Sequence, residues 1–199
     1  MSLRFALLAL LSVDAMTGYD LHKRFDSSVG HVWYAPDSQI YPELRKMEHD
    51  GLVTAEEVPW GTKGTKREYS ITDTGRDALR EWMNAMLPYA RFRDGMHLKS
   101  AYFEWATPEA ARAQLRAHIA HYEGELAQWE EQIHQIDTAT SPMLNRRLAV
   151  TPEKDRRRTA AFKRYAYEGL VARAEQEIIW ARNGLQLLDD LDAPASDTE

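Results

Sequence analysis

Apolar positions in the first 88 residues recur at helical spacing, are interrupted once by β-type residues, and then return to helical spacing. Polar breaks or glycines separate the segments. After Gly51 the runs LVTAEEV and REYSIT flank the glycine-rich tip PWGTKGTK, which predicts a β-hairpin. Thr72 then opens an amphipathic helix. The expected helices span 5–13, 19–30, 38–50 and 72–87.

Beyond residue 88 the pattern is helical only. Thr107-Pro108-Glu109 is a strong helix start, with an N-cap, a proline and an acid in order. The expected helices span 96–105, 107–136 and 159–191, with a loop and a basic patch between the last two. The predicted fold is mainly α with a small hairpin wing, a winged helix-turn-helix followed by an antiparallel helical dimerisation domain. The expected domains are 1–88 and 89–191, with a disordered tail at 192–199.

The long helix begun at Thr107 carries apolar residues that alternate by four and three, the spacing of a coiled-coil seam. These positions are Leu115, Ile119, Tyr122, Leu126, Trp129, Ile133 and Ile136. A seam of three heptads predicts dimerisation between two copies of the chain. The alternative is that the same residues pack against the final helix of their own chain.

The segment SQIYPELRKMEHDGLV (38–53) reads as a helix with one buried and one free face. Ile40, Leu44 and Met47 lie on the inward face. If Asp37 or Ser38 caps the helix, the internal proline falls in the first turn, where it costs little. The outward residues are Ser38, Gln39, Pro42, Arg45, Lys46 and His49.

Arginine, lysine and glutamine on a short, free helix fit the DNA major groove, because they hydrogen-bond guanine and adenine edges. Lys63, Lys66 and Arg67 in the hairpin supply cations for phosphates. Glu56 and Glu57 on the first strand must then point away from DNA. A solvated helix face and a flexible turn are the alternatives, and the two features together favour DNA.

Three segments, GYDLHKRFD (18–26), SQIYPELRKMEHDGLV and KREYSITDTGRDAL (66–79), together resemble the PadR-like transcriptional regulators of bacteria. The family pattern is a Gly-Tyr-acid helix start, an I-Y-P-x-L-x-x-x-E-x-x-G-L core and an x-Y-x-I-T-x-x-G wing exit. One departure is Met47, where the family usually has leucine. The resemblance covers about residues 3–85, and the remainder is similar to the longer, virulence-activator-type C-terminal domain of the family.

The resemblance implies a homodimeric repressor that binds a palindromic operator, with the third helix in the major groove and the wing beside it. Gln39, Tyr41 and Arg45 match the recognition helix of the family, and Tyr19 matches a backbone contact. PadR-like proteins often respond to phenolic or other aromatic molecules. Aromatic residues that could line such an effector pocket are Trp82, Phe92, Tyr102, Phe103 and Trp105. Ordinary packing is the alternative for each of them.

Composition narrows the classes of function. The 199 residues include no cysteine and carry a net charge of −6, so any DNA contact must come from local clusters of cations. No segment is long and apolar enough to span a bilayer, which predicts a cytoplasmic protein. His118 and His121 have a metal-ligand spacing, but an exposed polar face explains them, and neither metal nor cofactor is expected. No catalytic motif occurs, so the expectation is no enzyme; a winged helix that binds only other proteins is the competing hypothesis.

Overall fold

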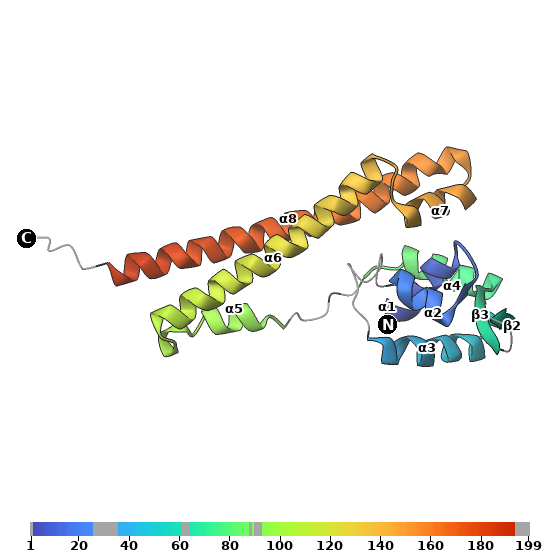
Figure 1. Cartoon of the computed structure of the whole chain (residues 1–199), viewed down its shortest axis with the longest axis horizontal. Helices are drawn as coiled ribbons and strands as arrows, with labels where there is room; N and C mark the ends of the chain where they lie inside the picture. The colour runs from blue at the N-terminus through green and yellow to red at the C-terminus, as the bar shows by residue number, and fades with distance from the viewer. Residues whose placement is uncertain (1, 26–35, 61–63, 88, 90–92, 194–199) are drawn as a thin grey trace, which may run out of the picture. The chain divides into compact units, whose positions relative to one another are not determined.

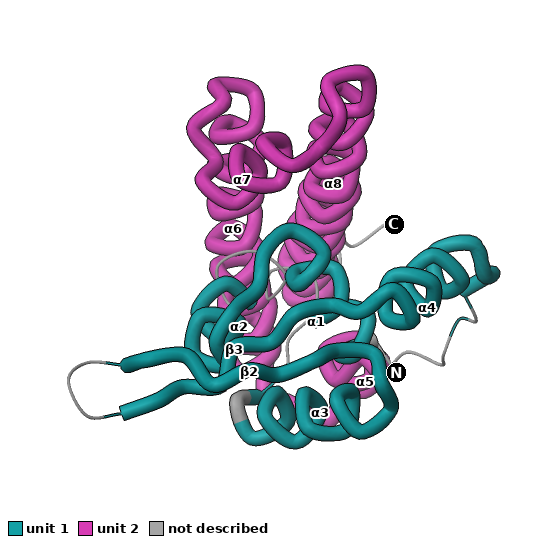
Figure 2. Tube along the Cα trace, turned by 90° about the vertical axis from the view of Figure 1, so that its right-hand side faces the viewer, with its two compact units in different colours: residues 1–89 teal, residues 90–199 magenta. Residues whose placement is uncertain are grey.

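The structure, a computed structural model, describes residues 2–25, 36–60, 64–87, 89 and 93–193. The chain forms two compact units, Met1–Tyr89 and Ala90–Glu199, which we describe one at a time (Figure 1; Figure 2). Among the described residues no helix combines the length and the apolar character that crossing a bilayer requires.

The N-terminal unit has helices around a small antiparallel sheet whose strand order is β1-β3-β2. The elements are α1 (Ser2–Leu11), β1 (Met16–Thr17), α2 (Gly18–Arg24), α3 (Asp37–His49), β2 (Val53–Trp60), β3 (Gly64–Ile71) and α4 (Asp73–Asn84). The order of elements is the predicted winged helix-turn-helix. The sequence pattern did not predict β1, because two residues are too few for a strand signal. Met16 lies opposite Tyr69 in this added strand.

Threonine caps fix where two of these helices begin. Thr17 Oγ1 accepts a hydrogen bond from the Asp20 amide and donates one to its carboxylate, which starts α2. Thr72 Oγ1 accepts from the Gly75 amide at 3.0 Å and starts α4. Helix α4 ends at Asn84, three residues before the predicted end. The second predicted helix is described only through Phe25, so its expected stop at Gly30 lies outside the described residues.

The core of the N-terminal unit holds α3 in place. Side chains from α1, α2 and α3 are fully buried there, namely Leu7, Leu8, Leu21, Ile40, Leu44 and Met47. Arg4 of α1 also contacts two acids: its Nε donates to Glu43 in α3 and its Nη2 lies 2.8 Å from Asp50 just beyond that helix. The orientation of α3, and with it the set of residues that face outward, is therefore fixed by apolar packing of its inner face and by the ion pair of Arg4 with Glu43.

The C-terminal unit is helical throughout. Its elements are α5 (Gly95–Ser100), the 3₁₀ helix η2 (Phe103–Trp105), α6 (Pro108–Asp137), α7 (Pro142–Val150) and α8 (Glu153–Asp192). Helices α6 and α8 run antiparallel along one another (Figure 1). Among the described residues, ion pairs between arginines and carboxylates link the two helices, and these join Arg112 to Asp189, Glu123 to Arg182 and Asp137 to Arg164.

Two helix predictions in this unit were wrong. The expected single helix 96–105 is two short ones, α5 and η2. The expected loop and basic patch before the last helix contain α7, which Ser141 caps and Pro142 opens. Leu144 of α7 is buried, so tertiary packing stabilises a helix whose own periodicity is weak. Helix α8 begins at Glu153, six residues before the predicted start, and residues 194–199 of the tail lie outside the described residues.

The predicted heptad seam packs within the chain. Trp129 of α6 forms a buried cluster with Tyr167 and Ala174 of α8, and four further members of the seam pack against this cluster. The partly buried residues of the cluster are Tyr122, Leu126, Ile133, Ile136, Leu170 and Val171. Burial raises the pKa of Tyr167 to about 12. The pairing of the seam with the final helix, stated above as the alternative, is what the fold contains.

Candidate nucleic-acid interface

The outer face of α3 is exposed as the sequence predicts. Ser38, Gln39, Tyr41, Pro42, Arg45, Lys46 and His49 are all exposed. Neither Arg45 nor Lys46 forms an ion pair within the described part of the chain. Two cations without acidic partners on a helix held by its other face are available to bind an anionic partner.

The position of Pro42 corrects the expected start of α3. The helix begins at Asp37, with Pro36 at the N-cap and no side-chain cap, so Pro42 lies inside the helix and beyond its first turn. Its missing N–H leaves the carbonyl group of Ser38 without the usual helical donor. Because Ser38 is exposed, that carbonyl group can bond to water.

The wing strands are longer than the sequence indicated. Residues of β2 and β3 pair from Val53 opposite Ile71 to Trp60 opposite Gly64, so only residues 61–63 connect them. Lys66 and Arg67 therefore lie on β3 and not in the tip. Lys63 lies outside the described residues. Figure 2 shows the hairpin extending away from the helices of the unit, with α3 beside its base.

A surface hollow brings the start of α2, the outer face of α3 and the wing together. Its lining residues come from four elements and are Thr17, Gly18, Tyr19, Tyr41, Arg45, Lys66, Arg67 and Tyr69. Five of these eight were predicted as DNA contacts from the sequence. The hollow thus unites aromatic rings and cations that lie far apart along the chain, a combination that suits a phosphate backbone and its sugars.

Close packing shapes this hollow. A β-carbon on Gly18 would lie 2.5 Å from Cε1 of Tyr41, so only glycine lets the ring of Tyr41 lie across the start of α2. Lys66 extends its ammonium over the ring of Trp60 and 5.1 Å from the centroid of Tyr19. The aromatic rings hold the lysine through cation–π contacts, and among the residues that the structure describes no acid forms an ion pair with it.

Acidic residues also lie beside the hollow. Glu48 of α3 accepts a hydrogen bond from Arg67 at 2.5 Å, so Arg67 fixes the wing to α3 and its charge is compensated. Glu56 and Glu57 are neighbours on β2, and alternate strand residues face opposite sides of a sheet. The two carboxylates therefore point to opposite faces of the hairpin, so at most one of them can point away from DNA that lies against one of these faces. Glu56 lies opposite Glu68, on the same sheet face as Lys66.

Sequence reasoning missed Trp60, Thr17, Gly18 and Tyr69 as parts of this surface. Trp60 is 59% exposed and contacts Lys66, although the tip that contains it looked unremarkable. An exposed tryptophan next to cations is the signal that could have singled it out. Thr17, Gly18 and Tyr69 reach this surface because β1 pairs with β3. A strand of two residues is too short for hydrophobic periodicity to predict it.

The predicted effector residues do not share one environment. Trp82 stacks on Phe5 within the N-terminal unit, with ring centroids 4.8 Å apart, which is the packing role given as the alternative. Tyr102 and Trp105 are exposed on the C-terminal unit, and Phe103 is half-buried. Phe92 lies outside the described residues.

The fold and this surface define a winged-helix protein with a long helical C-terminal unit. Residues 7–81 match the model of the transcriptional regulator PadR-like family. The N-terminal unit therefore contains a segment, residues 7–81, that matches this family of transcriptional regulators.

Three relatives illustrate the likeness. The negative transcriptional regulator PadR of Bacillus subtilis is 28% identical over 142 residues, which are 71% of this chain and 78% of that protein. A probable transcriptional regulator of Mycobacterium tuberculosis is 41% identical over 83 residues, or 42% of this chain and 44% of the relative. The virulence activator AphA of Vibrio cholerae has a similar structure, with 27% identity and a TM-score of 0.68 over 96% of this chain and 99% of AphA.

The Bacillus subtilis PadR has been solved in two complexes that share this fold. The complex with operator DNA superposes with a TM-score of 0.73 and 23% identity, over 95% of this chain and all of that one. The complex with p-coumaric acid has a TM-score of 0.72 and 24% identity, over 95% and 99% of the two chains.

Proposed function

We propose that this protein is a homodimeric transcriptional repressor that binds a palindromic operator and is released by a small aromatic ligand. The observation that carries the DNA half is the hollow where Tyr19, Tyr41, Arg45 and Lys66 meet. The likeness to a negative regulator solved with operator DNA supports it. The protein acts in the cytoplasm by binding, without catalysis.

In this proposal α3 enters the major groove. Gln39 and Arg45 read base edges, because an amide and a guanidinium match adenine and guanine there. Ser38, Pro42 and Lys46 face the flanking backbone. Lys66, together with Lys63 of the tip, binds phosphate, and Arg67 positions the wing through Glu48. Tyr19 and Tyr41 line the hollow as backbone contacts.

Two-fold symmetry would double these contacts and explains a palindromic site. Because the seam from Leu115 to Ile133 is occupied by α8, the pairing surface must be another one. Exposed large apolar residues of the C-terminal unit supply it, namely Leu98, Ile179, Leu187 and Leu191. Their exposure in a single chain is the sign of a face that a second copy covers.

The effector half of the proposal rests on chemistry and on the p-coumaric acid complex of the relative. Tyr102, Phe103 and Trp105 offer flat apolar surfaces to an aromatic ring. Phe92 and Trp82 were also predicted from the sequence, and Trp82 is the weaker candidate because it stacks on Phe5. Addition of aromatic acids to a complex of protein and operator would reveal release.

The DNA proposal is tested by selecting bound duplexes from a random pool and then titrating the winning site. We expect Arg45→Ala to cost about 1–3 kcal/mol and to relax base choice, since it removes a base contact. Lys66→Ala should weaken binding to all sequences and lower the salt dependence by about one phosphate contact. Arg76→Ala, which changes an exposed cation of α4 outside the hollow, is the matched control.

The competing function is a winged helix that binds only proteins, and the ion pair of Glu48 with Arg67 together with the net charge of −6 favours it. Selection from random DNA that enriches no sequence, together with DNA binding that does not depend on salt, would reject the repressor and leave this alternative.

A further inference from the structure

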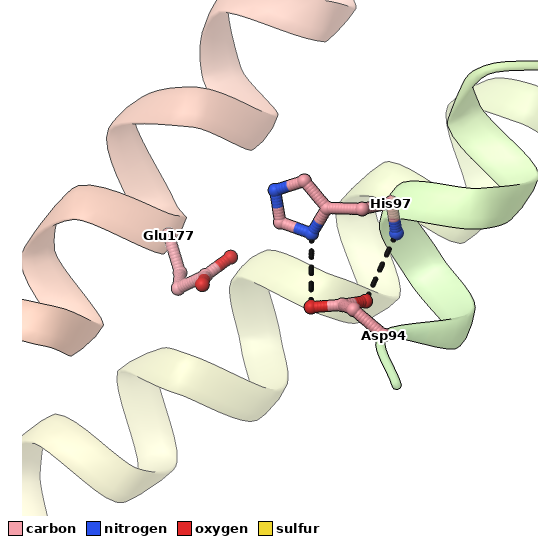
Figure 3. A group of neighbouring side chains, drawn as sticks. All are labelled: Asp94, His97 and Glu177. Atoms are coloured by element: carbon pink, nitrogen blue, oxygen red, sulfur yellow. Dashed lines mark hydrogen bonds and ion pairs between the residues drawn. The ribbon is translucent and has the colours of Figure 1, made fainter. Parts of the chain in front are cut away.

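Four side chains of metal-ligand type lie close together in the C-terminal unit, and two of them, His97 and His118, contact Trp180. Asp94 and His97 come from the start of α5, His118 from α6 and Glu177 from α8. One ligand atom from each of Asp94, His97 and Glu177 lies within 4.8 Å of the other two. Figure 3 shows the Glu177 carboxylate on one side of the His97 ring and Asp94 on the other.

Contacts with the surrounding helices hold each of these groups in place. Asp94 accepts hydrogen bonds from the amides of Met96 and His97, both at 2.9 Å, and its second oxygen lies 2.9 Å from His97 Nδ1. The ring of His97 stacks on Trp180 with centroids 4.1 Å apart. His118 Nε2 lies 3.1 Å from Glu177 Oε2, and both side chains are largely buried.

We propose that Asp94, His97 and Glu177 bind one divalent transition-metal ion of the zinc class, with His118 orienting Glu177. An imidazole nitrogen and two carboxylate oxygens suit such an ion, which binds them at about 2.0–2.2 Å and leaves a fourth position open. The three donor atoms, which lie within 4.8 Å of one another, would have to move closer together around the ion to reach that geometry. An outer histidine that bonds a ligating carboxylate is a common support of metal sites.

The charges also favour a cation. Two carboxylates lie near the same imidazole, and like charges at this distance repel unless a cation lies between them. The amides of Met96 and His97 both donate to Asp94, so this carboxylate has a fixed position beside the imidazole. A divalent ion would compensate both acids and would fasten α5, which has no buried residue of its own, to α8.

The test uses the untagged full-length protein after removal of metal with EDTA. Titration with Co²⁺ should give one equivalent per chain with visible absorption bands, and Zn²⁺ should abolish them by displacement. Hydrogen exchange of α5 should slow when Zn²⁺ is added.

The variants separate ligands from bystanders. Asp94→Asn keeps an N-cap acceptor and Glu177→Gln keeps the shape, so both should fold and lose Co²⁺ binding. His118→Gln should weaken it about 10–100-fold. His121→Gln in α6 and Glu175→Gln in α8 change exposed residues and are the matched controls. Both should bind Co²⁺ as the parent protein does.

Absence of Co²⁺ bands in the parent protein would overturn the proposal and leave a cluster of carboxylate–imidazole pairs only. Undiminished binding in both Asp94→Asn and Glu177→Gln would also overturn it, since the ion would then lie elsewhere. DNA binding, measured on the same preparations, is independent of either result.

Discussion

Two glycines of the N-terminal unit lie where a single methyl group would collide with a neighbour. At Gly18 the neighbour is the ring of Tyr41, which can turn aside. At Gly75 it is the carbonyl oxygen of Leu52, only 2.1 Å from where a β-carbon would stand, and a backbone atom in the core cannot move so easily. Gly75, the glycine of the wing-exit motif, therefore has a steric role. It lets the first turn of α4 lie directly against the backbone of Leu52, which follows α3.

Gly75→Ala should destabilise the N-terminal unit by about 1–3 kcal/mol, the usual cost of overpacking, even though alanine is the better helix former. Chemical unfolding followed by circular dichroism measures this. Thr74→Ala, at an exposed position in the same helical turn, should change stability by less than about 0.5 kcal/mol. Equal stability of Gly75→Ala and the parent would mean that the close approach is not real.

A third glycine, Gly51, has a φ of +72° and ends α3 in the left-handed conformation. It turns the chain directly into β2, and Thr72 Oγ1 donates to its carbonyl oxygen at 2.7 Å. The residues at both ends of the wing are thus joined to each other, so the hairpin leaves the unit at a defined angle to α3.

At the scale of elements, the pairing of α6 with α8 is the main feature of the C-terminal unit. A heptad pattern predicts only that a helix has an apolar stripe along one face. Any helix with a complementary apolar face can pack against that stripe. Helix α8 follows α6 in the same chain, and this connection raises the effective concentration of the apolar face of α8 near α6. The seam of α6 therefore packs against α8 in preference to the same seam of a second copy.

Leu126→Asp should therefore loosen the C-terminal unit itself. Leu126 packs against the cluster of Trp129, Tyr167 and Ala174, and a carboxylate there costs about 2–4 kcal/mol. Circular dichroism should show a lower midpoint of thermal unfolding for this unit. Ala127→Asp, at an exposed position one residue further on, is the control. If Leu126→Asp leaves the stability unchanged but abolishes the dimer, the seam would instead lie between two copies of the chain.

At the scale of the whole molecule, the negative net charge has to be reconciled with the proposed binding of a dimer to DNA. A net charge of −6 is compatible with a local cationic face, because many acids lie in ion pairs along α6 and α8 or beside α1. Within a Debye length of about 8 Å, DNA meets the local charges and not the total.

Leu187→Asp should produce a folded monomer with weakened operator binding, since this exposed residue of α8 belongs to the proposed pairing surface. Sedimentation velocity measures the mass, and circular dichroism should show unchanged helicity. Gln186→Asp, at the adjacent exposed position, is the control and should remain dimeric. A Leu187→Asp protein that stays dimeric would place the pairing surface on other residues.

The sequence by itself determined the order of elements in the N-terminal unit and the inward face of α3, because apolar spacing and helix caps are local. It also placed Tyr19, Tyr41, Arg45, Lys66 and Arg67 among the candidate contacts. It could not show that β1 would join the sheet, that α7 would form, or that Arg67 would pair with Glu48, since these depend on contacts between distant segments.

Only the tertiary structure decided which partner each surface took. The seam of α6 became core because α8 folds back along it, and Asp94, His97 and Glu177 came together although Glu177 lies 80 positions after His97 in the chain. Local patterns specify that a face is apolar or charged. Which atoms lie against it is a property of the folded chain, because the free energy of the contact depends on the geometry of both sides.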